Sequence, residues 1–204
     1  MGRGLAARLR AAGVDVVIGT RATGNLAAGE MSNEDATAAA GTVFLTVPPE
    51  AQVATVKAIR DGLEPGNVLV DCTVPLRWER GRLPVYEPPA AGSAAQNLPP
   101  LLPDGVMLVS GFHSVNAAHL GDTAHELDED VLLCGDDDIS IRKVAELVGR
   151  IPGLRAVDAG PLAHAASLER IVPVLIAINR RHKVRAGVRI TGLGNRPAGT
   201  GGAS

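Results

Sequence analysis

The sequence predicts an α/β fold in which helices alternate with the short buried strands of a parallel sheet. The first observation is the opening segment, where Leu5, Leu9 and Ala12 recur at helical spacing and Gly13 then ends the helix. The second is the apolar run Val14 to Ile18, which is typical of a strand buried on both faces of a parallel sheet. The third is the return of such runs along the chain, at residues 42–47, 67–71, 107–111, 130–134 and 154–158.

The glycines at the start of the first helix indicate what this unit binds. In dinucleotide-binding βαβ units an apolar strand and the loop G-x-G-x-x-G precede the helix. Gly2 stands where the third of those glycines would lie, at a point where helix and sheet pack closely. We therefore expect an N-terminally truncated Rossmann-like parallel sheet, with a strand and a G-x-G-x loop belonging upstream of Met1. The alternative is that Gly2 and Gly4 are ordinary residues at a helix start.

The end of the first predicted strand carries information on the nucleotide. An acidic residue here takes the ribose 2′-OH of NAD, whereas an arginine accommodates the 2′-phosphate of NADP. This chain has Gly19-Thr20-Arg21 and no acid. A hydroxyl beside a guanidinium suits a phosphate, because arginine presents a fixed fork of charged donors. The residues favour NADP over NAD, and the alternative is a surface arginine after a strand.

Composition narrows the class of protein. The chain has 204 residues, of which 46% are hydrophobic and only 2% aromatic, with a formal net charge of −2. These values argue against general disorder and against a nucleic-acid partner. Cys72 and Cys134 lie far apart, without the spacing of a zinc site or a disulfide framework. No apolar run of membrane-spanning length and no secretory signal is expected. A cytoplasmic enzyme or binding protein without a membrane partner remains.

The rest of the chain continues the alternation of strands and helices. Helices are predicted at about 33–40, 50–61, 115–120, 139–150 and 164–183, with loop-like segments at 22–32 and 77–104. We expect a dinucleotide-binding domain over 1–159, a helical extension over 160–192 and a disordered tail over 193–204. Ligands bind at the carboxyl ends of strands in an open parallel sheet. Residues 19–21, 46–49 and 71–75 are therefore expected to line one crevice, although each proline there could be a simple stop signal.

Two further features have competing interpretations. Asp136, Asp137 and Asp138 could suggest a metal ion, but a turn and an acidic helix start is the better interpretation. The long helix at 164–183 carries a wide apolar stripe, which can pack on the sheet domain or on a second subunit of a homodimer. Its members are Leu168, Ile171, Val172, Leu175, Ile176 and Ile178.

Several motifs, taken in order, carry a resemblance to a known family. They are GxxLAxRLxxAGxxVxxGxR from Gly2, NEDA from Asn33, CGDDD from Cys134 and GLRxxDAGPL from Gly153. Together with the proline-ended strand and a histidine-containing strand end, they resemble the NADPH-dependent deazaflavin-coenzyme reductases over nearly the whole chain. The resemblance implies hydride transfer between NADPH and 8-hydroxy-5-deazaflavin (coenzyme factor-420), two small-molecule cofactors whose rings stack in a cleft. It also implies that the protein contributes placement rather than acid–base chemistry.

The resemblance also assigns roles to particular positions. It implies that Thr20 and Arg21 hold the 2′-phosphate, and that Gly2 belongs to the glycine fingerprint. The resemblance implies no catalytic side chain and no metal ligand. The remaining implied cofactor contacts follow the path from adenosine to the stacked rings: Pro48, Pro49 and Val53 along adenosine and ribose, Leu76 beside the nicotinamide, His113 and Ala117 flanking the rings, and Ala186 as a backbone contact to the nicotinamide.

The chain departs from the family pattern in three places, which leaves other functions open. The strand and glycine loop that cradle the pyrophosphate are missing, so weak cofactor binding is expected. The second crossover is short, and Ala166, Arg170 and Val172 stand where the family pattern leads us to expect an arginine, a serine and a threonine facing the deazaflavin. One alternative is an NADP-dependent reductase of a small imine or ketone, for which Lys183 is the one nearby proton donor. The other is a non-catalytic binding or dimerisation module.

Overall fold

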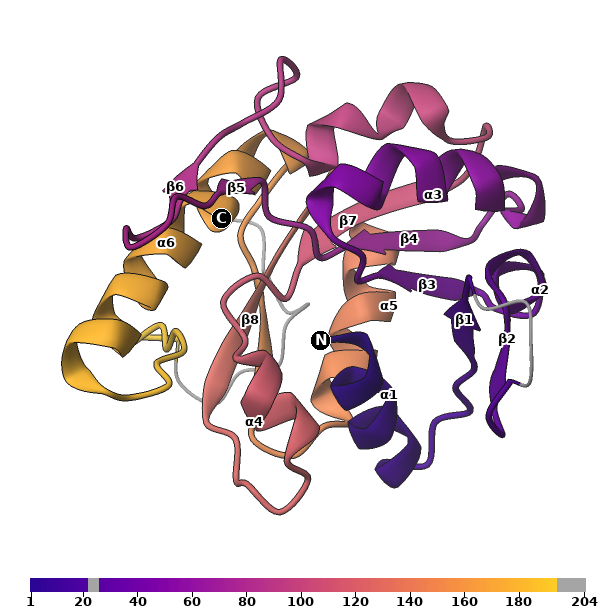
Figure 1. Cartoon of the computed structure of the whole chain (residues 1–204). Coiled ribbons are helices and arrows are strands. Elements are labelled where there is room, and N and C mark those ends of the chain that lie inside the picture. The colour runs from indigo at the N-terminus through magenta and orange to yellow at the C-terminus, as the bar shows by residue number, and fades with distance from the viewer. Residues whose placement is uncertain (22–25, 194–204) are drawn as a thin grey trace.

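The structure, a computed structural model, describes residues 1–21 and 26–193 and has a mixed, mostly parallel sheet at its centre (Figure 1). The strand order is β3 (Thr42–Leu45), β4 (Val68–Asp71), β7 (Met107–Gly111), β8 (Glu129–Gly135) and β9 (Leu154–Asp158). The first three strands are parallel, β8 runs antiparallel to β7, and β9 is parallel to β8. Within the described chain, β1 (Ile18–Thr20) and β2 (Glu30–Ser32) form a separate parallel pair beyond β3, and β5 (Leu76–Arg77) and β6 (Val85–Tyr86) an antiparallel hairpin.

Helices cover both faces of the sheet. On one face, α1 (Gly2–Ala11) and α5 (Asp138–Gly149) pack on Val68 and Val70 in the larger hydrophobic core. On the other, α3 (Gln52–Ile59), Leu98 and the 3-10 turn at Pro99–Leu101 pack on Leu69, while the 3-10 turn at Ala95–Asn97 packs on Leu108 through Ala95. The alternation of Val68, Leu69 and Val70 between the two cores follows from the two-residue period of a strand. The apolar run at 67–71 is therefore a strand buried on both faces, as predicted.

Local signals set the helix boundaries. The Ser32 hydroxyl accepts a hydrogen bond from the Asp35 backbone N–H at the start of α2 (Asn33–Ala38). Asp137 caps α5 in the same way, with its carboxylate 2.7 Å from the Ser140 nitrogen, which confirms the acidic helix start. Gly13 adopts a φ of +78° just after α1, as expected for the residue that ends a helix. Short 3-10 turns at Pro49–Ala51 and Arg60–Gly62 flank α3 and complete the predicted helix at 50–61.

The largest error of the sequence-based prediction concerns the position of the first strand. The prediction placed a fully buried strand at 14–18, but β1 comprises Ile18–Thr20 and residues 14–18 are only partly buried or exposed. A strand needs a neighbour, and the one neighbour of β1 within the described chain is β2, which pairs only with Ile18–Thr20. The strand β2 lies in the predicted loop 22–32, of which residues 22–25 are outside the described residues. Its sequence, Glu-Met-Ser, has no apolar run to reveal it.

The segment between β4 and β7 was predicted to be irregular. It contains the short hairpin β5–β6, and two 3-10 turns replace the proline-broken helix expected at 93–102. Pro99 begins the second turn, where a missing N–H costs nothing. The short helix α4 (Ala117–Gly121) and the strands β7 and β9 lie where the sequence predicts them. The antiparallel direction of β8 was not predicted, because an apolar run does not reveal strand direction.

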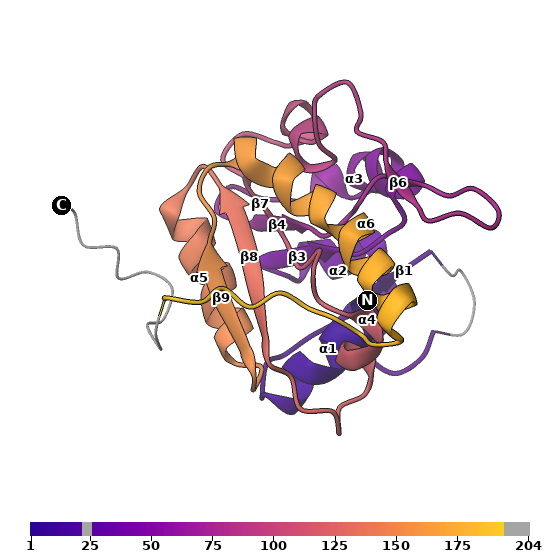
Figure 2. The same cartoon turned by 90° about the vertical axis from the view of Figure 1, so that its left-hand side faces the viewer.

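The long helix α6 (Ala165–His182) lies across one side of the molecule; Figure 2 shows it crossing in front of β3, β4 and β7. Only part of its predicted stripe is buried, with Leu168 and Leu175 inside and Ile178 exposed. With its preceding turn, Leu162–His182 is long and apolar enough to cross a membrane, contrary to the expectation that no run reaches that length. A helix packed on a protein core passes the same test, so this length is weak support for a membrane span.

Candidate dinucleotide site at the carboxyl edge of the sheet

The carboxyl ends of three neighbouring parallel strands meet at one edge of the sheet. Leu45 of β3 pairs with Asp71 of β4, and Asp71 pairs with Ser110 of β7. The segments that follow these strands, 46–49, 72–75 and 112–114, therefore lie at this shared edge. This is the position at which open parallel sheets bind ligands. Two of the three strand ends expected to form one crevice are thus adjacent.

The third expected strand end lies on the other side of a gap in the sheet. Thr20 is the last residue of β1, and the exposed Arg21 follows it directly before residues 22–25, which lie outside the described residues. The paired sheet β1–β2 is not hydrogen-bonded to β3. Neither Thr20 nor Arg21 lines the cavity that separates β1 from β3. Their role as the 2′-phosphate contact stays a prediction.

The start of α1 lies against the carboxyl end of β3. A Cβ atom on Gly2 would lie 2.5 Å from the hydroxyl oxygen of Thr46, so a larger residue at position 2 would force the Thr46 side chain or the helix to shift. Met1 is the N-cap residue of α1, and its side chain makes no capping hydrogen bond. The first N–H groups of a helix attract anions such as a pyrophosphate. The close packing predicted for Gly2 is therefore observed, next to the strand end where a nucleotide would lie.

The adenosine-side residues follow β3 without a break. Pro48 caps the 3-10 turn Pro49–Ala51, and its exposed ring lies at the shared edge of the sheet. Pro49 begins that turn, where its fixed backbone angle is suited to a helix start. Val53 lies one turn further along, partly buried in α3. All three belong to one continuous segment, but no structural observation assigns them to a bound nucleotide.

His113 is the most unusual polar residue of this edge. It follows β7, is 8% exposed, and neither ring nitrogen has a hydrogen-bond partner among the described residues. Burial lowers its pKa from 6.5 to about 4, so the ring is neutral at pH 7. The preceding residue, Phe112, has a φ of +68°, which is rare for a bulky side chain. Buried polar groups are usually paired, so the unpartnered nitrogens of His113 fit a ligand contact.

A buried carboxylate at the same edge was not singled out from the sequence. Asp71 is 0% exposed and accepts a hydrogen bond from the Thr73 hydroxyl at 2.9 Å, while the Gln52 amide donates to that hydroxyl at 2.8 Å. Burial raises the pKa of Asp71 to about 7, and the charge of Glu169 adds to this increase. The side chains of Asp71, Thr73 and Gln52 thus form a buried polar chain directly beneath the strand ends.

Glu169 anchors the long helix to this edge. Its carboxylate is fully buried and accepts hydrogen bonds from the Tyr86 hydroxyl at 2.8 Å and the Ala94 backbone N–H at 3.1 Å. Burial raises the pKa of Glu169, and it also raises the pKa of Tyr86, whose hydroxyl donates to that carboxylate. The sequence does contain a signal for this contact, namely an acid between Leu168 and Ile171 on the apolar stripe.

The three helix positions that depart from the family pattern do not form a polar surface. Arg170 lies with its guanidinium carbon 5.4 Å from the centre of the Tyr86 ring, which is a cation–π contact. Ala166 and Val172 are partly buried, and their side chains carry no polar atoms. Arg170 therefore contributes to the packing of α6 on β6.

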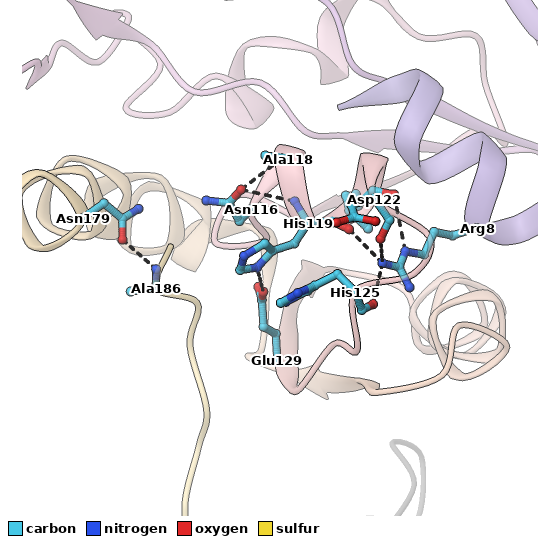
Figure 3. A network of polar contacts seen from close by, with 10 residues as sticks. Arg8, Asn116, Ala118, His119, Asp122, His125, Glu129, Asn179 and Ala186 are labelled. Atoms are coloured by element: carbon cyan, nitrogen blue, oxygen red, sulfur yellow. Dashed lines mark hydrogen bonds and ion pairs between the residues drawn. The ribbon is translucent and has the colours of Figure 1, made fainter. Parts of the chain in front are cut away.

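A buried arginine connects α1 to the segment that follows His113. The Arg8 guanidinium donates hydrogen bonds to the backbone carbonyls of His119, Leu120, Asp122 and His125 (Figure 3). Gly4 makes this contact close, since a Cβ there would lie 2.7 Å from the Gly121 nitrogen. The position of α4, which begins with the exposed Ala117, is thus fixed by α1. An isolated sequence gives no local sign of a contact that spans more than a hundred residues.

The chain after α6 returns to the sheet. The Ala186 backbone N–H donates to the side-chain oxygen of Asn179 at 2.6 Å (Figure 3), so this nitrogen already has a partner in the structure. Further along, the Ile190 N–H donates to the buried carboxylate of Asp130 at 2.6 Å, and Arg155 pairs with the same carboxylate. Because the Ala186 N–H is already bonded to Asn179, the backbone contact expected of Ala186 would fall to its carbonyl oxygen.

Leu76, which was expected beside the nicotinamide, lies in the hairpin strand β5 and is partly buried.

The fold and this edge define the class of protein: a Rossmann-like α/β chain of the kind found in dinucleotide-dependent reductases. A solved structure described as a putative F420-dependent NADP reductase, from Arthrobacter, superimposes with a TM-score of 0.77 at 24% identity, covering 90% of this chain and 91% of its own. A pyrroline carboxylate reductase from Plasmodium falciparum, with NADP bound, gives a TM-score of 0.55 at 11% identity, covering 89% of this chain and 63% of its own. At these identities the likeness shows the fold alone.

Sequence comparison identifies the family. The family model of the coenzyme F420-dependent NADP oxidoreductases matches residues 1–75. The F420-dependent NADP reductase of Methanothermobacter thermautotrophicus is 35% identical over 94% of this chain and 90% of its own length. That of Methanothermobacter marburgensis is 34% identical over 94% of both chains. The chain therefore belongs to the F420-dependent NADP reductase family.

Proposed function

We propose that this protein transfers a hydride between NADPH and the 8-hydroxy-5-deazaflavin coenzyme factor-420. The observation that carries the proposal is the 35% identity, over 94% of the chain, to a protein named F420-dependent NADP reductase. Bound together, the two cofactors supply the chemistry, in which a C–H bond of the nicotinamide breaks as a C–H bond of the deazaflavin forms. No side chain has to exchange a proton in that step, which suits an edge whose histidine is neutral.

The residues of the carboxyl edge support the binding of NADPH. The start of α1 lies beside Thr46, so its N–H groups can hold the pyrophosphate. We propose that Thr20 and Arg21 hold the 2′-phosphate, since no acid follows β1 to take a ribose hydroxyl. Pro48, Pro49 and Val53, which continue from β3, would then border the adenosine and ribose.

The other end of the edge would hold the reacting rings. His113 fits the expected contact, because its two buried ring nitrogens have no partner among the described residues. Ala117 at the start of α4 would flank the same rings without steric hindrance, and Leu76 would exclude water on the nicotinamide side. Ala186 would contribute its carbonyl oxygen, because its N–H is bound to Asn179. These side chains place and shield the rings rather than react with them.

The proposal extends to domain organisation and assembly. We propose that residues 1–159 form the dinucleotide-binding domain and residues 160–192 a helical extension. Val174 on α6 is 54% exposed, Ile178 37% and Trp78 in the neighbouring hairpin 65%. Exposed apolar side chains of this size favour a protein partner, and a second copy of the chain is the simplest one. We further propose a cytoplasmic enzyme that has neither nucleic acid nor membrane as a partner.

A binding titration followed by a turnover assay tests the proposed function. NADPH and NADH are titrated into the protein, and the absorbance of the oxidised deazaflavin is then followed with each. We expect tighter binding of NADPH and an NADPH-dependent loss of deazaflavin absorbance. Reduction of a small imine or ketone without reduction of the deazaflavin would favour the alternative reductase. Binding of neither nucleotide would favour a non-catalytic module.

A further inference from the structure

Positive charges gather at the end of α6, in a part of the sequence that carries no acid. Glu169 is the last acidic residue of the chain, and its carboxylate is buried. Four cationic side chains then fall within residues 180–185, which we call the cationic turn. They are Arg180, Arg181, Lys183 and Arg185, with His182 among them. The whole chain has a formal net charge of −2, so this positive charge is a local excess, of the kind that attracts anions.

The charges of the cationic turn are not neutralised by neighbouring carboxylates. All four cationic side chains are exposed, and none forms an ion pair or a hydrogen bond with another described residue. By contrast, Arg189, a few residues further along, pairs with Asp128 at 3.0 Å. Like charges so close together repel one another. An anion from outside the chain would offset that repulsion.

The backbone of the cationic turn is ordered by contacts on both sides. Lys183 has a φ of +56°, in the left-handed region that glycine usually occupies after a helix. Asn179 closes the turn by accepting a hydrogen bond from the Ala186 N–H at 2.6 Å (Figure 3). Further along, the Ile190 N–H donates to the buried Asp130 carboxylate at 2.6 Å. Because the backbone is already held in place, less entropy is lost when the turn binds a ligand.

The cationic turn lies beside the part of the edge that is proposed to hold the reacting rings. Gly187, which follows the turn, packs on Glu129, since a Cβ on Gly187 would lie 2.5 Å from that carboxylate. Glu129 in turn contacts His119 of α4, with 3.4 Å between Oε1 and Nδ1 (Figure 3). The helix α4 begins at Ala117, four residues after His113. A molecule whose ring lies at His113 and Ala117 can therefore extend towards the end of α6.

We propose that the cationic turn binds the acidic side chain of the deazaflavin coenzyme, which carries phosphate and carboxylate groups. This inference rests on the proposed hydride transfer, because it takes the ring of the same coenzyme to lie at His113. Arginine presents paired N–H donors that match carboxylate and phosphate oxygens, and lysine adds a mobile point charge. The phosphates of NADPH are a separate matter, since the start of α1 and Arg21 are proposed to hold them.

Calorimetric titration with two ligands tests the proposal. One ligand is the whole oxidised coenzyme, and the other is its deazaflavin ring without the acidic side chain. The variant is the double substitution Lys183→Asn and Arg185→Gln, in which asparagine tolerates the left-handed conformation at position 183. We expect the Kd of the whole coenzyme to rise by about 5–30-fold, as for the loss of two exposed charge contacts. The Kd of the ring alone should not change.

A matched control separates this effect from a change in overall charge. The double substitution Arg142→Gln and Arg150→Gln removes two charges from exposed positions at α5 and should leave both Kd values unaltered. Added salt should weaken the binding of the whole coenzyme to the wild type and have little effect on the ring alone. An unchanged Kd of the whole coenzyme in Lys183→Asn with Arg185→Gln would overturn the proposal. So would an equal loss with the ring alone, or in the control.

A peptide of about three γ-linked glutamates tests the cationic turn without any hydride transfer. At millimolar concentration it should slow the hydrogen exchange of residues 180–190 in the wild type and not in the variant at positions 183 and 185. If it does so while the protein reduces no deazaflavin, the anion site stands and the proposed function fails. No slowing in the wild type would overturn the site. Binding of the wild type to vesicles of anionic lipid, with no effect of the peptide, would overturn it in favour of a membrane surface.

Discussion

Gly2 and Thr46 lie so close that a Cβ atom on Gly2 would be 2.5 Å from the Thr46 hydroxyl oxygen. This contact fixes the start of α1 at the carboxyl end of β3. It places the positive end of a helix next to the strand ends that bind ligands in open parallel sheets. The proposed nucleotide site depends on this arrangement, because a helix start displaced from the strand ends could not reach a pyrophosphate lying across them.

Reversing the charge of Arg21 should change the nucleotide preference. Arg21→Glu removes the proposed partner of the 2′-phosphate and supplies an acid that can accept hydrogen bonds from a ribose hydroxyl. We expect the Kd of NADPH to rise by ~10–100-fold, the equivalent of one lost charge-assisted contact, while the Kd of NADH falls. Calorimetric titration measures both values. Arg142→Glu, with the same charge change on the exposed face of α5, should leave both unchanged. An unaltered preference in Arg21→Glu would place the phosphate elsewhere.

Adding one methyl group at Gly4 should destabilise the protein. The Cβ of Gly4→Ala would lie 2.7 Å from the Gly121 nitrogen, so the backbones of α1 and α4 must move apart. We expect a loss of roughly 1–3 kcal/mol in the free energy of unfolding, measured by urea denaturation. Gly149→Ala is the matched control, because its Cβ meets no atom within 4 Å and alanine favours a helix. Equal effects of the two substitutions would argue against the close packing of α1 on α4.

The buried His113 should make the protein less stable in mild acid. Its pKa is lowered to about 4 in the folded state, from the usual 6.5. Between these values the unfolded chain binds a proton that the folded chain does not, so the free energy of unfolding falls as the pH falls from 6.5 to 4. The loss approaches about 3 kcal/mol. His113→Leu should flatten the stability profile in this window, and the exposed His182→Gln should not. An unchanged slope in His113→Leu would mean that another group titrates there.

Asp71 should have the opposite dependence on pH. Its pKa is raised by burial from 3.8 to about 7, so the folded state retains a proton that the unfolded state releases. Its contribution to stability is therefore fully present below pH 3.8 and is lost as the pH rises through 7. Asp71→Asn is neutral throughout, so its stability relative to the wild type should improve by about 3 kcal/mol between pH 5 and 8. The exposed Asp104→Asn is the control. A constant difference between Asp71→Asn and the wild type would contradict a titrating Asp71.

The predictable parts of the fold share one physical property. The strands at 107–111 and 154–158 are short apolar runs bounded by turn residues, and their observed limits agree with the prediction. The strand expected at 14–18 failed because pairing with a neighbour, rather than apolar character, decides where a strand forms. The strand at Glu30–Ser32 forms from a polar sequence for the same reason.

The sequence indicates those residues of the candidate site that lie at the end of a strand or the start of a helix. Gly2 was named from the glycine fingerprint and His113 from the family resemblance; both lie at the carboxyl edge of the sheet, and their roles in cofactor binding stay predictions. The guanidinium of Arg8 was missed, because its backbone partners lie more than a hundred residues away and leave no pattern in the local sequence. The carboxylate of Glu169 was also missed, although an acid on an apolar helix stripe is a signal; its partners, the Tyr86 hydroxyl and the Ala94 and Ala95 N–H groups, are also remote in sequence.

The central claim is a direct transfer of hydride from NADPH to the deazaflavin. The most direct measurement uses NADPH carrying deuterium at the transferable position of the nicotinamide, with mass spectrometry of the reduced deazaflavin. The proposed function predicts that the reduced deazaflavin contains the deuterium. Reduced deazaflavin without the label, formed in ordinary water, would show that the hydrogen comes from solvent and would contradict direct transfer between two stacked rings.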